Sequence, residues 1–223
     1  MFEGFSQATV DFMWNIRFNN NKEWFEAHKD EYKRDFHAPM KELGQEVYAR
    51  ITAEYGERGF IHKLSRIYKD ARRIRDGNRY RDHLWFSVER PSAEDEESSG
   101  VLTFWFDLNP EGWSYGLGYY AAKAGTMENV RANINKKPQE LEKLIDLLNS
   151  QDEFKLEGDS YVRQKQAPSM KTQEWYNKKS FSLIHYGAIN DELFLSDFIN
   201  RLVNGYKFLM PFYDYFVAAE RAE

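Results

Sequence analysis

Residues 63–81 form the densest group of side chains in the sequence that could bind an anion. This segment, KLSRIYKDARRIRDGNRYR, has a local net charge of +6 from eight basic residues and two aspartates. Its charged residues are Lys63, Arg66, Lys69, Asp70, Arg72, Arg73, Arg75, Asp76, Arg79 and Arg81. Guanidinium groups bind carboxylate and phosphate through paired charge-assisted hydrogen bonds, and Tyr68 and Tyr80 can stack or donate a hydroxyl. The segment therefore predicts a site for a small anion.

Two structural interpretations of this segment stand beside the functional one. If the segment is helical, basic residues 66, 69 and 73 share one face with Asp70, which then orients a neighbour rather than doing chemistry. The segment is also compatible with a solvated charged face that pairs with the acidic residues 94–97, because exposed ion pairs contribute little free energy.

The histidines suggest one candidate for acid–base catalysis and no metal site. They are His28, His37, His62, His83 and His185, and none forms an HxH or HExxH pair. The chain has no cysteine, so thiolate metal sites and cysteine nucleophiles are excluded, and we expect no bound metal. His185, beside Tyr186 in a predicted strand, is a candidate general base if it faces a cleft, and Asp70 is the other candidate. Packing in the core is the structural alternative for His185.

The sequence carries no nucleotide-binding motif. Residues 116–118 (GLG) lack the third glycine of a dinucleotide fingerprint, and neither GxxxxGK[ST] nor SxxK occurs. Residues 112–116 (GWSYG) have the GxSxG spacing, but they lie at the start of a predicted strand and not at a strand-to-helix turn, so they do not indicate a nucleophile elbow. We therefore expect no cofactor.

The elements that must position these residues begin with helices. Ser6 can cap a first helix to about residue 18, and Asn21 can cap a second of about four turns through Tyr32. Pro39 suits the first turn of a third, which runs to Tyr55.

Strands follow in the middle of the chain. Residues 84–90, 101–107 and 113–120 are rich in aromatic and β-branched residues and predict an antiparallel meander, with residues 91–100 as a solvated loop. Alternation places Phe104 and Phe106 on one face of their strand and Trp105 on the other.

The remainder of the chain mixes helices and strands. Helices are predicted from Thr126, from Pro138, from after Pro168 through Trp175 and from Asn190, with a strand at 181–187 and a short hairpin about residues 158–159. We therefore expect the α+β class, a central antiparallel meander with terminal helices packed around it. We expect a single domain over residues 1–223, in which residues 1–58 are helical, residues 60–125 are rich in strands and residues 126–223 are mixed but mainly helical.

Composition limits the partners. The formal charge of the whole chain is −5, so the residues outside 63–81 sum to −11, which disfavours nucleic acid as a partner. Hydrophobic residues make up 42% and aromatic residues 17%, enough for a large core. No run of about 18 apolar residues and no signal peptide occurs, so we expect a cytoplasmic protein with no membrane contact. The sequence leaves the oligomeric state open.

Several segments together resemble the family known as domain of unknown function 2461. They are residues 20–25 (NNKEWF), Tyr32 and Pro39, 66–72 (RIYKDAR), 80–81 (YR), 118–120 (GYY), 130–134 (VRANI), 154–163, Pro168 and 179–181 (KSF). The resemblance implies a mostly bacterial α+β protein with no assigned activity.

The basic segment and this resemblance lead to one hypothesis with two alternatives. The hypothesis is a cleft beside the meander that binds a carboxylate or phosphate ligand. Its residues are Arg66, Lys69, Asp70, Arg72, Tyr80, Arg131 and Arg163. The first alternative is a hydrolase-like enzyme that uses Asp70 or His185 as acid or base, with the arginines stabilising negative charge. The second is a protein–protein interaction module that docks through its aromatic C-terminal helices.

Overall fold

The computed structural model describes residues 1–70, 72, 74, 77–91 and 100–220. The chain divides into two compact units that are interleaved along the sequence. Unit 1 consists of Met1–Val88, Trp105–Tyr115 and Tyr186–Asn204, and unit 2 of Glu89–Phe104, Gly116–His185 and the chain from Gly205 onward. Several strands and the last helix each contribute residues to both units.

The sheet confirms the predicted α+β class and the antiparallel meander. Its strands are β1 Ile61–Leu64, β2 Leu84–Glu89, β3 Thr103–Asn109, β4 Gly112–Gly118, β5 Lys155–Glu157 and β6 Ser182–Ala188, in the order β1-β2-β3-β4-β6-β5. In β3, Phe104 and Phe106 are buried and Trp105 is half-buried, as the alternation predicts.

The N-terminal helices belong to unit 1. They are α1 Gln7–Phe18, α2 Lys22–Ala27, α3 Lys29–Glu31, the π-helical turn η1 Tyr32–His37, α4 Ala38–Tyr55 and the 3-10 turn η2 Gly56–Arg58. The Asn21 side chain caps α2 by accepting a hydrogen bond from the Trp24 amide at 2.9 Å, as expected. The predicted boundary before Pro39 is wrong, because η1 joins α3 to α4 without a loop.

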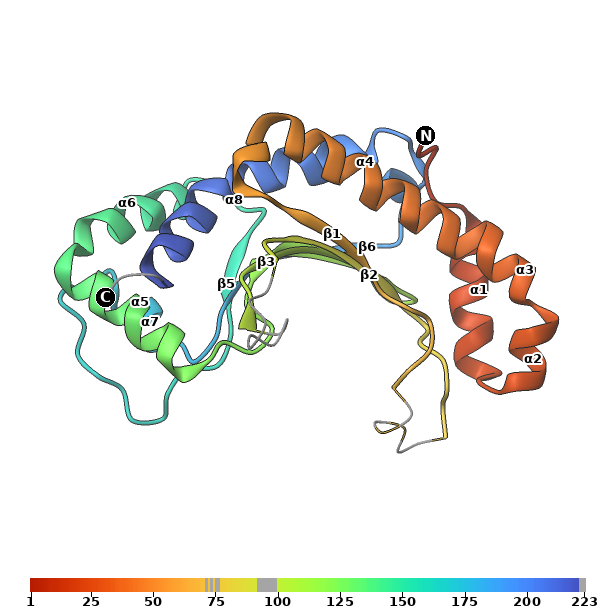
Figure 1. Ribbon diagram of the computed structural model, residues 1–223, viewed down its shortest axis with the longest axis horizontal. Helices are drawn as coiled ribbons and strands as arrows, with labels where there is room; N and C mark the ends of the chain where they lie inside the picture. The colour runs from red at the N-terminus through yellow and green to blue at the C-terminus, as the bar shows by residue number, and fades with distance from the viewer. Residues whose placement is uncertain (71, 73, 75–76, 92–99, 221–223) are drawn as a thin grey trace. The chain divides into compact units, whose positions relative to one another are not determined.

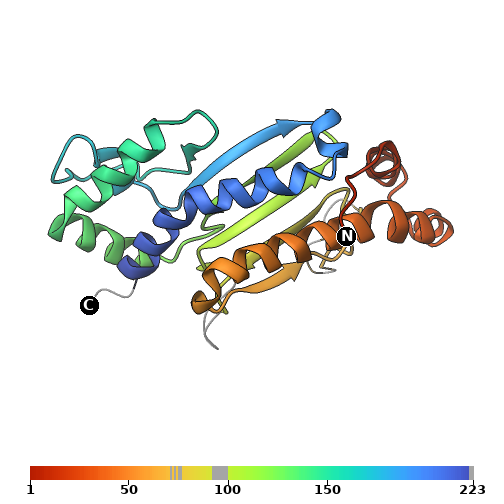
Figure 2. The ribbon, with the colours of Figure 1, turned by 90° about the horizontal axis from the view of Figure 1, so that it is seen from above.

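Helix α4 packs along one face of β1 and β2 (Figures 1 and 2). Phe86 of β2 lies 5.6 Å, ring to ring, from Phe106 of β3, and Phe106 lies 5.6 Å from Phe198 at the start of helix α8 (Phe198–Glu220). These rings, all buried, form much of the core of unit 1.

Unit 2 contains α5 Ala124–Lys136, α6 Pro138–Asn149, α7 Gln173–Tyr176 and the second half of α8. Trp175 stacks on Phe216 at 5.5 Å, and Phe216 contacts Phe181 at 4.4 Å. Helix α8 continues through Pro211 and is preceded by the 3-10 turn η5 Asp191–Phe194. None of the helices among the described residues is both long and apolar enough to cross a bilayer.

The structure differs from two local interpretations of the sequence. Residues 65–70, which follow β1, are extended and not helical: Tyr68 and Tyr80 form an isolated antiparallel bridge, and backbone hydrogen bonds join Lys69 to Arg79 and Arg81 to Ile67. The predicted hairpin about residues 158–159 is also wrong, since β5 pairs antiparallel with β6, at Leu156 with Leu183, instead of with the residues that follow it.

Candidate functional site

A cavity of about 440 Å³ in unit 1 is lined by four lysine and arginine side chains and two histidines. We call it the basic pocket. It is lined by Phe25, Lys29, Tyr32, Lys33, His37, Lys41, Gln45, His62, Leu64, Ser65, Arg66, Ile67 and Tyr68. One wall is the continuous helix from α3 through η1 into α4, and the other is β1 with the extended residues that follow it.

The helical wall presents polar side chains at a strict interval of four residues. They are Lys29, Lys33, His37, Lys41 and Gln45. In a regular α-helix each step of four exceeds a full turn by about 40°, so such a row would spiral away from the pocket. The π-helical turn closes its hydrogen bonds over five residues, and the Ala38 amide donates to the Lys33 carbonyl. This wider turn offsets the drift and keeps the row on one wall.

The opposite wall is fixed by backbone hydrogen bonds to neighbouring segments. The Ser65 amide donates to the Trp85 carbonyl at 2.8 Å, and the Trp85 amide donates to Ser65 Oγ at 2.9 Å. Arg81 Nη1 donates to the carbonyls of Arg66 and Tyr68, at 2.6 Å and 2.7 Å. Arg81 therefore shapes the wall while its charge is directed at carbonyl oxygens.

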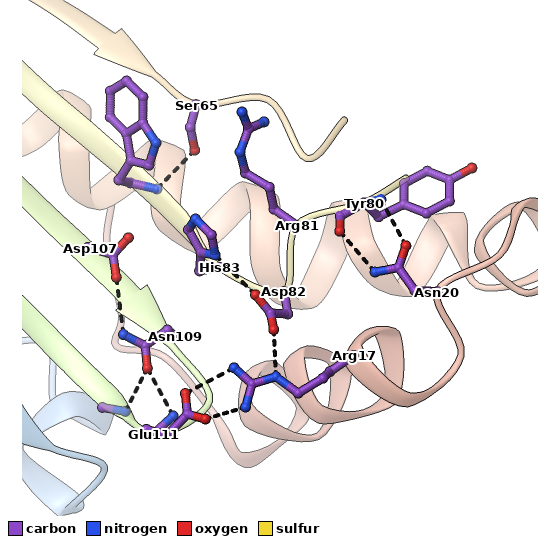
Figure 3. A network of polar contacts seen from close by, with 12 residues as sticks. Arg17, Asn20, Ser65, Tyr80, Arg81, Asp82, His83, Asp107, Asn109 and Glu111 are labelled. Carbon is purple, nitrogen blue, oxygen red and sulfur yellow. Dashed lines mark hydrogen bonds and ion pairs between the residues drawn. The ribbon is translucent and has the colours of Figure 1, made fainter. Parts of the chain in front are cut away.

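Aromatic rings form the apolar side of the lining. Phe25 lies 5.6 Å from Tyr32 and 5.7 Å from Tyr68, ring to ring, and stacks at 4.2 Å on Tyr80. Tyr80 is buried behind these rings, and the Asn20 side chain holds its backbone by two hydrogen bonds of 2.9 Å (Figure 3). Burial, and then the neighbouring Tyr68, raise the pKa of Tyr32 to about 12, so its hydroxyl stays protonated at neutral pH.

The pocket has a strong positive charge. Lys29, Lys33, Lys41 and Arg66 line it, and none of the described lining residues is acidic. Lys29 pairs with Glu26 at 3.1 Å and Lys33 with Asp30 at 3.3 Å, both one helical turn earlier. Within the described residues, the Lys41 ammonium and the Arg66 guanidinium have no ion-pair partner.

The two histidines of the pocket are held neutral at pH 7. Burial lowers the pKa of His37, and the positive charge of Lys41 lowers it further. Burial also lowers the pKa of His62, whose Nε2 is buried without a hydrogen-bond partner among the described residues and faces Gly44 of α4. The neutral imidazoles add no charge to the pocket at pH 7, but each can take up a proton and become positively charged below pH 6.5.

The structure brings only some of the predicted site residues to this pocket. Arg66 lines it, and Tyr80 supports its aromatic wall. Arg72 does not line it: 89% of the Arg72 side chain is exposed, and its guanidinium pairs with both carboxylate oxygens of Asp70, at 3.2 Å and 3.0 Å. Lys69 is also outside the lining, with its amide bonded to the Arg79 carbonyl.

The other predicted residues belong to unit 2 or lie outside the described residues. Arg131 is 7% exposed and stacks on Tyr161, with its guanidinium carbon 5.3 Å from the ring centre. Arg163 is exposed, and His185 Nδ1 lies 3.0 Å from the Glu153 carbonyl oxygen. Residues 73, 75 and 76 of the basic segment, and the acidic residues 94–97, lie outside the described residues.

The lysines and His37 of the helical wall were not predicted. Their signal in the sequence is the repeat of basic residues at 29, 33, 37 and 41. In a regular helix of this length, residues four apart do not stay on one face. The repeat lies on one side of this helix because of the π-helical turn, which the sequence pattern does not predict.

A second polar cluster of unit 1 lies outside the pocket (Figure 3). Arg17 Nε donates to Asp82 at 2.5 Å, and the same guanidinium forms a two-point ion pair with Glu111. His83 Nδ1 lies 3.0 Å from the other oxygen of Asp82, and the pKa of Asp82 is held well below its usual value by His83 and then by Arg17. Burial raises the pKa of the nearby Asp107. The cluster ties α1 to the loops that border β2 and β4.

Comparison with known proteins places the chain in a family. A family model described as "Conserved hypothetical protein (DUF2461)" matches residues 8–215, which is most of the chain. The chain belongs to the DUF2461 family. The matched range contains every residue of the basic pocket, so the pocket lies inside the family domain. A search of curated proteins gives no match.

No metal centre is evident in the stretches of this DUF2461 chain that the structure describes. Within residues 1–70, 72, 74, 77–91 and 100–220, no three His, Asp or Glu side chains come together in a way that could hold an ion.

Proposed function

We propose that the basic pocket binds a small organic or inorganic anion that carries a carboxylate or phosphate group. The observation that carries the proposal is a cavity with four permanent cations and no acidic residue in its described lining. Lysine and arginine side chains that face a shared cavity repel one another, and a bound anion relieves this repulsion while forming charge-assisted hydrogen bonds.

Two of the four cations are the strongest candidates for direct contact. Lys41 on the helical wall and Arg66 on the opposite wall are not engaged by a described carboxylate, whereas Lys29 and Lys33 each have one nearby. Arg66 offers a planar fork that can hold two oxygens of a phosphate or carboxylate, and Lys41 adds a point charge. Ser65 and the protonated Tyr32 hydroxyl add neutral donors to the same lining.

The π-helical turn supports the same proposal from the backbone. Such turns are rare and occur frequently at functional sites. Here the turn contributes Tyr32, Lys33 and His37 to the lining. Its presence is understandable if the alignment of these side chains serves binding.

The test is a calorimetric titration with inorganic phosphate at pH 7.5 and constant ionic strength, set by sodium chloride. We expect saturable binding that weakens about tenfold in Lys41→Met and in Arg66→Met, because each loses a charged hydrogen bond of about 1.5–3 kcal/mol. The matched control is Lys143→Met, an exposed lysine of α6 in unit 2, which we expect to bind as the unaltered chain does. Binding that is absent, or that is unchanged in both pocket variants, would contradict the proposal.

A further inference from the structure

We infer that the ligand of the basic pocket is an aryl anion, in which a phosphate or carboxylate group is joined to a flat aromatic ring. This inference rests on the proposed function and specifies the ligand class that the pocket selects. It is carried by the size of the cavity and by the exposed, firmly held ring of Tyr68.

The first argument is size. A volume of about 440 Å³ is in the range of pockets that hold drug-sized molecules, about 300–1,000 Å³. A bare phosphate is comparable to a few water molecules, each of which takes about 30 Å³ in the liquid. An inorganic anion would leave most of the cavity filled with water, so the ligand needs a body as well as a charged group.

The second argument is the chemistry of the lining. Phe25, Tyr32, Leu64, Ile67 and Tyr68 supply carbon surface beside the cations. The lining therefore suits a ligand with two ends, one charged and one apolar, rather than a polyanion or a sugar with hydroxyls on every side.

The third argument is the position of Tyr68. Its side chain is 48% exposed although it belongs to an otherwise buried aromatic cluster. Its ring meets Phe25 edge-on at an interplanar angle of 76° and lies 5.4 Å from Tyr80, and Arg81 holds its carbonyl. The ring thus packs against two buried rings while about half of its side chain remains accessible, and this packing lowers the entropy cost of stacking on it. Flat rings stack well on tyrosine, and saturated chains of equal size do so less specifically.

Lys29 connects this ring to the charged wall. Lys29 and Tyr68 both line the cavity. An aryl phosphate with its ring on Tyr68 therefore has cations of the helical wall within the same cavity.

The experiment compares three ligands by calorimetric titration at pH 8: inorganic phosphate, phenyl phosphate and propyl phosphate. All three are then mainly dianionic, because the second pKa of such phosphates is about 6 to 7. We expect phenyl phosphate to bind at least tenfold more tightly than inorganic phosphate, and propyl phosphate to fall between them. We expect Tyr68→Leu to remove the preference for phenyl phosphate and Tyr68→Phe to keep it. The matched control is Tyr120→Leu, which alters a tyrosine of unit 2 that is 91% exposed.

The outcomes separate the two proposals. The aryl inference is overturned if phenyl phosphate binds no better than propyl phosphate, or if the preference for phenyl phosphate survives in Tyr68→Leu. In either case the proposal of an anion site still stands if Arg66→Met weakens the binding of inorganic phosphate. If no ligand binds, or if binding is insensitive to Arg66 and Lys41, both proposals are wrong. Circular dichroism of each variant, with its thermal midpoint, shows that a loss of binding is not a loss of folding.

Discussion

At the scale of single residues, charge alone does not identify a binding side chain; its nearest partners do. Arg66 and Arg72 are six residues apart in the same basic segment. Arg72 pairs with Asp70 in solvent, while Arg66 faces a cavity and has no described carboxylate partner. The two histidines of the pocket differ in their nearest neighbours as well, because His37 lies beside Lys41 whereas His62 Nε2 faces Gly44 of α4.

His37 leads to a prediction about pH. Its pKa lies below 6.5, so acidification from pH 8 to pH 5.5 begins to add a positive charge to the pocket. We expect sulfate, whose own charge stays at −2 over this range, to bind severalfold more tightly at the lower pH. His37→Gln should flatten this dependence in a calorimetric titration, whereas the control His185→Gln in unit 2 should keep it. A rise of equal size in His37→Gln would show that another group is responsible.

Asp82 leads to a prediction about stability. The folded-state pKa of Asp82 is depressed, so its contribution is present above the unfolded pKa of about 3.9 and is lost as the pH falls below that value. We expect Asp82→Asn to lower the free energy of unfolding by about 2 kcal/mol at pH 7, the range for hydrogen bonds to charged groups. The difference between the variant and the unaltered chain should shrink between pH 5 and pH 3 in urea unfolding.

The control for this experiment is Asp11→Asn, an exposed aspartate of α1. A difference for Asp82→Asn that stays constant down to pH 3 would mean that the Arg17 and His83 contacts contribute little.

At the scale of elements, close contacts between neighbouring strands limit the size of the side chain that a strand position can hold. Gly187 of β6 lies under the indole of Trp113 in β4, and a Cβ built at Gly187 would come within 2.0–2.6 Å of that ring. Trp113 cannot easily move, because it is buried, its Nε1 donates to the Ala188 carbonyl at 3.0 Å and it packs edge-on against Phe198.

We therefore expect Gly187→Ala to lower the free energy of unfolding by about 3 kcal/mol, the upper range for forcing extra carbon into a packed site. The matched control is Gly56→Ala, which makes the same change in unit 1 where a Cβ would meet nothing within 4 Å. Urea unfolding of both variants measures the effect, and similar midpoints would contradict it.

Elements with local signals could be predicted from the sequence, and those that depend on distant partners could not. The Asn21 cap, the alternation in β3 and the α+β class were predicted correctly, because each is encoded within a few neighbouring residues. β5 was paired wrongly because its partner β6 lies more than twenty residues further along. The same holds for the site: Arg66 was found in a basic segment, but the basic row of the helical wall needed a π-helical turn that the sequence pattern did not reveal.

At the scale of the molecule, the last turn of α8 helps to hold unit 2 together. The Glu220 carboxylate in that turn pairs with Arg90 at 3.0 Å and accepts a hydrogen bond from the Tyr119 hydroxyl at 2.5 Å. The backbone carbonyl of Glu220 accepts a hydrogen bond from Asn129 Nδ2 at 2.9 Å. The Glu220 side chain is 10% exposed, so the pair is well shielded from water. One residue therefore connects three different segments.

We expect Glu220→Gln to destabilise the chain by about 3 kcal/mol, since it removes the charge of one partner of a shielded ion pair. In hydrogen-exchange mass spectrometry, the loss of protection should be greatest in α5 and the last turns of α8. Glu128→Gln, an exposed glutamate on α5, serves as the control and should show no such loss. Equal loss throughout α1 to α4 would argue against a local role.

The π-helical turn has a consequence for the ancestry of this chain. A turn of this kind differs from regular helix by one extra residue. Deleting one residue between Tyr32 and His37 would restore a regular helix, but it would rotate Lys29 by about 100° relative to Lys41 and separate the two halves of the basic row. The extra residue has then been retained although the backbone prefers a regular α-helix. Relatives that no longer bind the ligand should be free to lose the extra residue. The length of this helix should therefore distinguish relatives that keep the pocket from relatives that have lost it.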